Sequence, residues 1–220
     1  VTACARDEAM DVDFLPLTVE VQEKSYAAGK MPGGFFKREG RPSEQAILNC
    51  RLVDRPLRPL FPKNYHNDTQ IAITVLSTDL ELPYSSMGIL GASMALMVSD
   101  IPFSEPVGAC EIGYVDGELI VNPTYEQLET SELHLTVAGT SEAIMMVEAG
   151  AKFVSEELLL EALELAQENN VKMAELQKKI IQDIGKDKNI IEEVAIDPVI
   201  NDKLIDSSSK KLIDLYDKGL

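Results

Sequence analysis

The sequence predicts an α+β fold, and three observations support this prediction. Several short segments alternate apolar with polar residues, which is the pattern of strands with one buried face. The segment 87–99 is small and apolar on every side, as expected for a helix buried in a core. A long segment after Ser155 repeats leucine and alanine with the spacing of an amphipathic helix. With 220 residues, 45% of them hydrophobic, the chain can bury such a core.

The first part of the chain predicts two strands and one helix. Its opening residues, VTACA, are an apolar run that predicts a strand, and a clear alternation predicts another over 17–23. Residues 25–34 are rich in glycine and indicate a loop. Ser43 is a suitable N-cap for a helix over 44–54, which Pro56 is expected to end.

The middle of the chain predicts further strands around the buried helix. They are expected at 71–75, 107–114, 118–121, 133–138 and 143–147. Asp116 and Gly117 separate two of these segments, and this residue pair favours a tight type I′ hairpin turn. The segments on either side of Gly139 are expected to pair with each other in the same way.

The last third predicts two helices and a boundary between domains. Two glutamates follow Ser155, and the helix dipole favours acidic residues in a first turn. After Gly185 the composition changes to Lys-Asp-Lys-Asn, which indicates a linker, and a second helical pattern covers 198–217. We therefore predict one domain over residues 1–187 and the start of a helical domain over 188–220. The absence of an initial Met suggests a piece of a longer protein, with N-terminal strands missing.

The charged residues are distributed unevenly. The chain has a formal net charge of −17, yet residues 30–63 carry eight basic and three acidic side chains, a net charge of +5. Five of the six arginines lie between Arg38 and Arg58. Residues 64–150 hold thirteen acidic side chains and no lysine or arginine. Because arginine presents a fork of donors that matches phosphate and carboxylate groups, this basic segment (residues 30–63) predicts a local anion-binding site.

Other kinds of site are not indicated. No apolar run is long enough to span a bilayer, and no secretory signal pattern is recognised. The three cysteines are far apart and lack zinc-binding spacing, so we expect reduced thiols in a cytoplasmic protein. The acidic residues of 7–13 lack metal-ligand spacing, and no metal site is predicted. His66 and His134 lack triad partners, and His134 is interpreted as a surface residue of a strand.

Five stretches of the sequence resemble the first core domain of the bacterial polynucleotide phosphorylase family. The longest is AAGKMPGGFFKREGRPSEQAILNCRLVDRPLRPLFP, at residues 27–62. The others are NDTQIAITVLS, GASMALMVSDIPF, DGELIVNPTYEQLE and LTVAGTSEAIMMVEAGAKFVSEE. They follow in the family's order within residues 1–185, and a match of this length is far more specific than any single motif.

This resemblance implies an RNase PH-like fold, with a mixed β-sheet and packed helices, followed by the start of an all-helical domain. It implies an enzyme that degrades RNA from the 3′ end. Inorganic phosphate attacks the terminal linkage, nucleoside diphosphates are released and Mg²⁺ assists. The family's catalytic groups and metal ligands belong to a second core, which this chain lacks, so no catalytic residue is assigned. The serines 207–209 are interpreted as part of a helix, not as the phosphate site.

The resemblance also implies the partners. Single-stranded RNA is the expected substrate, and three chains are expected to form a homotrimeric ring with a central channel. A cytoplasmic location, a role in mRNA turnover and contacts with RNA-degradosome proteins are expected, whereas a membrane or DNA is not.

An RNA-binding loop is assigned by the same resemblance. The residues concerned are Phe35, Phe36, Lys37, Arg38 and Arg41. Phe35 to Arg38 match a two-aromatic, two-basic loop at the channel constriction. Arg41 lies just before the predicted helix, whose N-terminus favours an anion, so contact with RNA phosphate is preferred to a structural role. Exposed aromatic rings stack on unpaired bases, while basic groups hold the backbone. The family usually has two arginines here, and Lys37 keeps the charge without the fork of donors. From the residues alone, the two phenylalanines are equally consistent with a buried core.

Two further alternatives stay open. Arg51, Arg55 and Arg58 share one helical face, which fits either a phosphate-binding track or ion pairs that hold the helix in place. The proline-rich segment after them favours the ion pairs. We interpret the chain as the RNA-guiding, non-catalytic first core of the enzyme. The alternative is a non-catalytic RNA-binding ring subunit of an exosome-like assembly.

Overall fold

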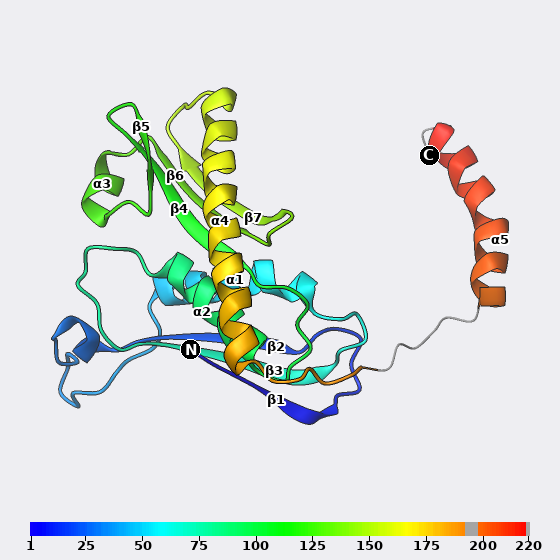
Figure 1. Ribbon diagram of the computed structural model, residues 1–220, viewed down its shortest axis with the longest axis horizontal. Helices are drawn as coiled ribbons and strands as arrows, with labels where there is room; N and C mark the ends of the chain where they lie inside the picture. The colour runs from blue at the N-terminus through cyan, green and yellow to red at the C-terminus, as the bar shows by residue number, and fades with distance from the viewer. Residues whose placement is uncertain (192–197, 219–220) are drawn as a thin grey trace. The chain divides into compact units, whose positions relative to one another are not determined.

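The computed structural model describes residues 1–191 and 198–218. The chain divides into two compact units, Val1–Ile190 and Ile191–Leu220. The first unit holds a three-stranded and a four-stranded sheet with helices packed on them (Figure 1). The predicted α+β class is therefore confirmed. The predicted linker falls partly on residues 192–197, outside the described residues.

The three-stranded sheet has mixed strand directions. Its strands are β1 (Thr2–Ala9), β2 (Leu17–Glu23) and β3 (Asn67–Val75). The central strand β3 pairs antiparallel with β1 and parallel with β2. A parallel pair needs a long crossover connection, and α1 (Glu44–Leu57), which packs on β2, lies on that connection. The mixed sheet expected from the resemblance is thus present.

The four-stranded sheet is antiparallel throughout. Its strands are β4 (Gly108–Val115), β5 (Glu118–Val121), β6 (Leu133–Gly139) and β7 (Ile144–Ala151). Asp116 and Gly117 join β4 to β5 with φ angles of 51° and 85°. Positive φ at both central residues is the mark of a type I′ turn, so this prediction is confirmed. The pairing of β6 with β7 is confirmed as well.

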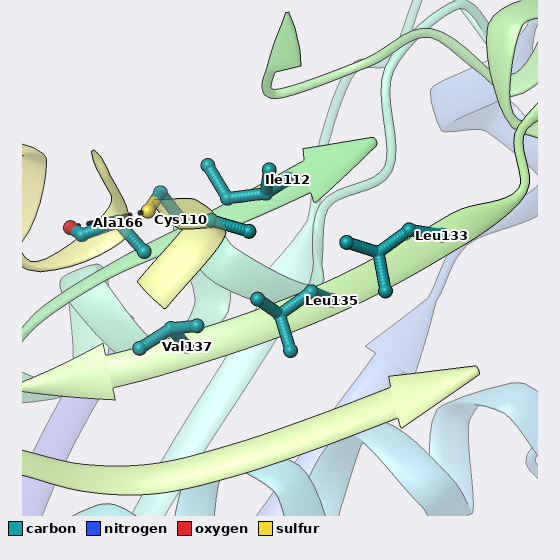
Figure 2. Packing of buried hydrophobic residues seen from close by; sticks show 7 residues of the cluster. Cys110, Ile112, Leu133, Leu135, Val137 and Ala166 are labelled. Atoms are coloured by element: carbon teal, nitrogen blue, oxygen red, sulfur yellow. Dashed lines mark hydrogen bonds between the residues drawn. The ribbon is translucent and has the colours of Figure 1, made fainter. Parts of the chain in front are cut away.

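Helices cover both faces of the four-stranded sheet. The helices α1 and α2 (Ser85–Val98) lie between the two sheets, and α4 (Glu156–Ile184) covers the opposite face (Figure 1). Side chains of β4, β6 and α4 form the core on that face (Figure 2). A Cβ atom on Gly108 would lie 2.5 Å from the carbonyl oxygen of Asn170, so this glycine allows α4 to approach β4 closely.

The helix α1 is longer than predicted. Ser43 is its N-cap as expected, and the Ser43 hydroxyl accepts a hydrogen bond from the Ala46 amide at 3.0 Å. The expected end before Pro56 is wrong, because α1 continues to Leu57 and a 3-10 helix follows at Arg58–Leu60. A proline removes one helical hydrogen bond. Here both Pro56 and Leu57 are buried, and packing of this last turn offsets the loss.

The end of the first unit is tied to α2. The Lys188 ammonium donates hydrogen bonds to the carbonyls of Leu96, Met97 and Ser99 at 2.7, 2.9 and 2.7 Å. These carbonyls lie at the C-terminus of α2, where a cation is favoured. These contacts connect the last residues of the first unit, Val1–Ile190, to its core.

The second unit contains the expected C-terminal helix. This helix, α5, runs over Pro198–Asp217. The hydroxyls of Ser207 and Ser208 donate to the carbonyl of Leu204 in the preceding turn. Within the described residues, no helix is long and apolar enough to cross a membrane.

Candidate functional site

The two phenylalanines of the expected RNA-binding loop are exposed. They lie on the connection between a 3-10 helix, η1 (Ser25–Ala28), and α1. Phe35 is 93% and Phe36 77% exposed, and their rings meet edge to face with centroids 5.4 Å apart. The alternative of a buried core is therefore wrong. We call residues 35–41 the aromatic–basic loop.

The three cations of the aromatic–basic loop are exposed and unpaired. Lys37, Arg38 and Arg41 all lie at the surface. In the part of the chain that the structure describes, none of them forms an ion pair with a carboxylate. Arg41 also lies two residues before the N-cap of α1, where the helix N-terminus favours an anion. The loop thus presents two aromatic rings beside three positive charges that no described carboxylate pairs with.

The backbone of the loop is strained at Lys37. Gly34 and Lys37 have φ angles of 76° and 50°, in the left-handed region. This conformation costs a residue other than glycine about 1–2 kcal/mol. Such strain persists only where the surrounding structure holds it, and it is concentrated at functional sites.

The arginines of α1 differ from those of the loop. Arg58 forms two hydrogen bonds with Asp54 at 2.9 and 2.8 Å, and its guanidinium also donates to the carbonyls of Leu15 and Leu17. Arg55 pairs with Glu148 on β7 at 2.6 Å. Both arginines therefore hold α1 in place, as the ion-pair alternative predicts. Arg51 is exposed and forms no ion pair with any described residue.

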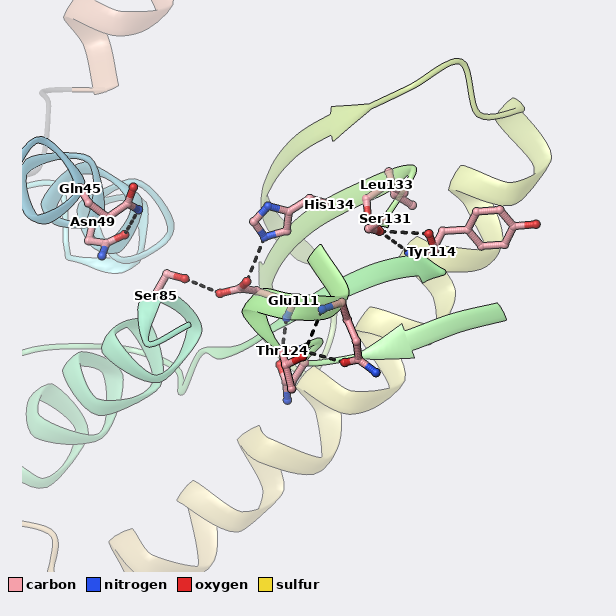
Figure 3. Close-up of polar contacts among 11 residues, drawn as sticks. Gln45, Asn49, Ser85, Glu111, Tyr114, Thr124, Ser131, Leu133 and His134 are labelled. Atoms are coloured by element: carbon pink, nitrogen blue, oxygen red, sulfur yellow. Dashed lines mark hydrogen bonds and ion pairs between the residues drawn. The ribbon is translucent and has the colours of Figure 1, made fainter. Parts of the chain in front are cut away.

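A second polar site was not predicted. Glu111 on β4 is only 2% exposed, and its carboxylate accepts hydrogen bonds from Ser85 of α2 and from Nε2 of His134 on β6 (Figure 3). We call these three residues the Glu111 cluster. Alternation along β4 and β6 turns Glu111 and His134 toward α2, whereas Ile112 and Leu135 face α4. His134 is exposed, as expected of a surface residue, and its imidazole also pairs with the buried carboxylate of Glu111 at 2.9 Å.

The hydrogen bonds of the Glu111 cluster do not match those that activate a serine nucleophile. The Ser85 hydroxyl donates to Glu111 and not to His134, so the imidazole is not positioned to remove the hydroxyl proton. A cavity of about 360 Å³ is lined by residues of α1, α2, β6 and β7, and Ser85 and His134 of the cluster are among them. The three residues are far apart in sequence. The register of β4 with β6 brings Glu111 and His134 together, and the packing of α2 on β4 adds Ser85.

Mg²⁺ has no place among the described residues. No group of three His, Cys, Asp or Glu side chains in them could hold a metal ion. The acidic residues of 7–13, which lack metal-ligand spacing in the sequence, form no such group. The described residues therefore do not fit the metal that the resemblance implies.

Comparison with known proteins defines the family. A model of the 3′ exoribonuclease family, domain 1, matches residues 1–102, and the model of domain 2 of the same family matches residues 105–169. The chain belongs to the 3′ exoribonuclease family. The aromatic–basic loop lies within the domain 1 match, and Glu111 and His134 lie within the domain 2 match.

Curated relatives narrow this assignment. The polyribonucleotide nucleotidyltransferase of Caldicellulosiruptor saccharolyticus is 46% identical over 212 residues, which cover 96% of this chain and 30% of the relative. The proteins of the same name from Bacillus cytotoxicus and Dehalococcoides mccartyi are 47% and 51% identical, over 96% and 86% of this chain. These alignments cover 30% and 26% of the two relatives. The chain therefore spans less than a third of the length of these relatives.

Proposed function

We propose that this chain is the RNA-guiding, non-catalytic first core of a phosphorolytic 3′-to-5′ exoribonuclease. One observation carries the proposal: Phe35 and Phe36 are exposed beside three cations that no described carboxylate neutralises. Aromatic rings stack on unpaired bases of any sequence, and cations attract the phosphates between them. The acidic body of the chain confines the RNA to this loop.

The reaction belongs to the whole protein. An oxygen of inorganic phosphate attacks the phosphorus of the last RNA linkage. The 3′ oxygen of the preceding nucleotide leaves and becomes the new 3′ hydroxyl, and a nucleoside 5′-diphosphate is released. Mg²⁺ would be held outside this chain, since the described residues offer no metal site. The proposal includes a homotrimer, degradosome proteins as partners, a cytoplasmic location and a role in mRNA turnover. It places the first core over 1–187 and the start of a helical domain over 188–220.

RNA binding tests the loop assignment. Phe35→Ala/Phe36→Ala and Arg38→Ala are expected to weaken binding of a fluorescent oligo(A), measured by anisotropy. Each stacked base contributes about 1–3 kcal/mol, so the double variant should lose at least about tenfold in affinity. Phe153→Ala is a matched control, because Phe153 is fully exposed but lies between β7 and α4. Native affinity in the double variant, with the fold intact, would contradict the assignment.

A second assay separates the enzyme from the alternative ring subunit. The full-length protein, supplied with phosphate, Mg²⁺ and poly(A), should release ADP. No phosphate-dependent ADP, together with normal RNA binding, would favour a non-catalytic ring subunit.

A further inference from the structure

Two glutamates form hydrogen bonds that connect the aromatic–basic loop and its C-terminal flank to the preceding strand and 3-10 helix. On one side, the Glu39 carboxylate accepts hydrogen bonds from the backbone amide of Ser25 at 2.9 Å and from the Ser25 hydroxyl at 3.0 Å. On the other side, the hydroxyl of Ser43, the N-cap of α1, donates to Glu23 at 2.6 Å. Both glutamate contacts connect the loop segment to the region where β2 ends and η1 begins.

The contact of Glu23 extends to a second helix. Its other carboxylate oxygen accepts a hydrogen bond from the hydroxyl of Tyr84, the residue at the N-cap position of α2. Burial raises the pKa of the Tyr84 hydroxyl, and its bond to Glu23 raises it further, so Tyr84 stays a donor. Glu23 therefore joins the start of α1 to the start of α2, a helix with seven buried residues.

Glu39 lies among the cations of the loop without pairing with them. It lies beside Arg38 and before Arg41, in the stretch where RNA phosphates would approach. A carboxylate there repels phosphate, and hydrogen bonds from neutral donors do not remove its charge, so its presence needs another reason. In the described structure Glu39 forms no ion pair with these arginines, and both of its oxygens are turned toward Ser25 instead. Glu39 therefore leaves Arg38 and Arg41 open to contact with phosphate, while its own carboxylate binds Ser25.

We propose that Glu39 and Glu23 are positioning residues that hold the aromatic–basic loop in the conformation that binds RNA. The loop has no sheet or helix of its own between Pro32 and Ser43, and its backbone is left-handed at Gly34 and Lys37. Such a conformation needs external anchors, and the two glutamates supply them. The inference rests on the proposed function, because it concerns how the same loop presents its rings and charges.

A double-mutant cycle tests the positioning role. The variants are Glu39→Ala, Phe35→Ala/Phe36→Ala and their combination, with Glu161→Ala as a control that removes the same charge from an exposed site on α4. Binding of fluorescent oligo(A) to the 220-residue chain is measured for each. Glu39→Ala is expected to weaken binding about tenfold, and to have little further effect once both rings are absent. Glu161→Ala should bind as the native chain does.

The outcomes separate this inference from the proposed function. If the ring variant is weakened but Glu39→Ala binds as tightly as the native chain, or more tightly, the positioning role is wrong while the loop assignment stands. Equal losses in the presence and absence of the rings would also overturn it, because a general structural role gives additive effects. If the ring variant binds normally, the proposed function itself fails. If Glu39→Ala does not fold, Ser25→Ala replaces it: this variant removes the bond from the Ser25 hydroxyl to Glu39 and keeps the bond from the Ser25 amide, so a smaller loss of affinity is expected.

Discussion

At the scale of single residues, burial raises the pKa of the Cys110 thiol. This thiol lies in the core between β4 and α4 and donates a weak hydrogen bond to the carbonyl of Ala166 at 3.6 Å. Burial, with a smaller contribution from the neighbouring Glu111 carboxylate, raises the pKa of this thiol to about 12. Cys4, in contrast, is exposed on β1. Although both are free cysteines, only one of them is accessible to a reagent.

Alkylation is predicted to distinguish these two thiols. At pH 8, a thiol with this pKa is ionised in about one molecule in ten thousand, and the thiolate is the reactive form. Iodoacetamide should therefore label Cys4 in the native chain and leave Cys110 unmodified, as mapped by mass spectrometry of peptides. In urea both should react. Fast labelling of Cys110 without denaturant would mean that α4 does not cover β4 as described.

At the scale of elements, Arg58 determines how α1 is anchored. Its guanidinium contacts Asp54 within the helix and the carbonyls of Leu15 and Leu17 just before and at the start of β2. Because α1 continues through Pro56 to Leu57, Arg58 lies at its C-cap, where the guanidinium reaches these two carbonyls. Lysine could provide the charge but not four hydrogen bonds in a planar fork.

Removing this anchor is predicted to destabilise the fold. Arg58→Ala should lower the free energy of unfolding by about 2 kcal/mol, because it leaves Asp54 and two carbonyls without their charged donor. Arg58→Lys should recover less than half of this loss. Arg51→Ala, on the same helix, should change stability by less than about 0.5 kcal/mol, since Arg51 has no ion pair with a described residue. Urea titration followed by circular dichroism measures all three, and equal effects of Arg51→Ala and Arg58→Ala would refute the anchor.

Local signals predicted the elements, whereas the contacts between elements were not visible in the sequence. Asp116-Gly117 and the cap at Ser43 act over a few residues, and both were predicted correctly. The capping box of Thr124 and Gln127, which begins the short helix α3 (Tyr125–Thr130), is an equally local signal that was overlooked.

The Glu111 cluster could not be predicted from local sequence signals. Its three members come from α2, β4 and β6, and no spacing pattern links them. The same holds for the contact between Glu39 and Ser25, which joins residues fourteen positions apart across a loop. Burial of Phe35 and Phe36 was also undecided from the sequence, because exposure depends on which surface a loop meets after folding.

At the scale of the whole molecule, the basic residues are concentrated in one segment of an acidic chain. The chain carries a net charge of −17, and no basic residue lies between 64 and 150. Arg55 and Arg58 lie within the basic segment but are occupied by Glu148 and Asp54. Six of the eight basic residues in the segment form no ion pair with a described carboxylate, and three of these six lie in the aromatic–basic loop.

This distribution predicts a shallow dependence of RNA affinity on salt. Each phosphate neutralised on a single strand contributes about −0.7 to the slope of log K against log salt concentration. Three free cations, Lys37, Arg38 and Arg41, should therefore give a slope of about −2, measured by oligo(A) anisotropy between roughly 50 and 200 mM salt. Arg38→Ala should make the slope shallower by about 0.7, whereas Phe35→Ala/Phe36→Ala should weaken binding and leave the slope unchanged, because stacking releases no counterions. A native slope near −5 would show that cations outside the loop, such as Arg51, also contact the RNA backbone.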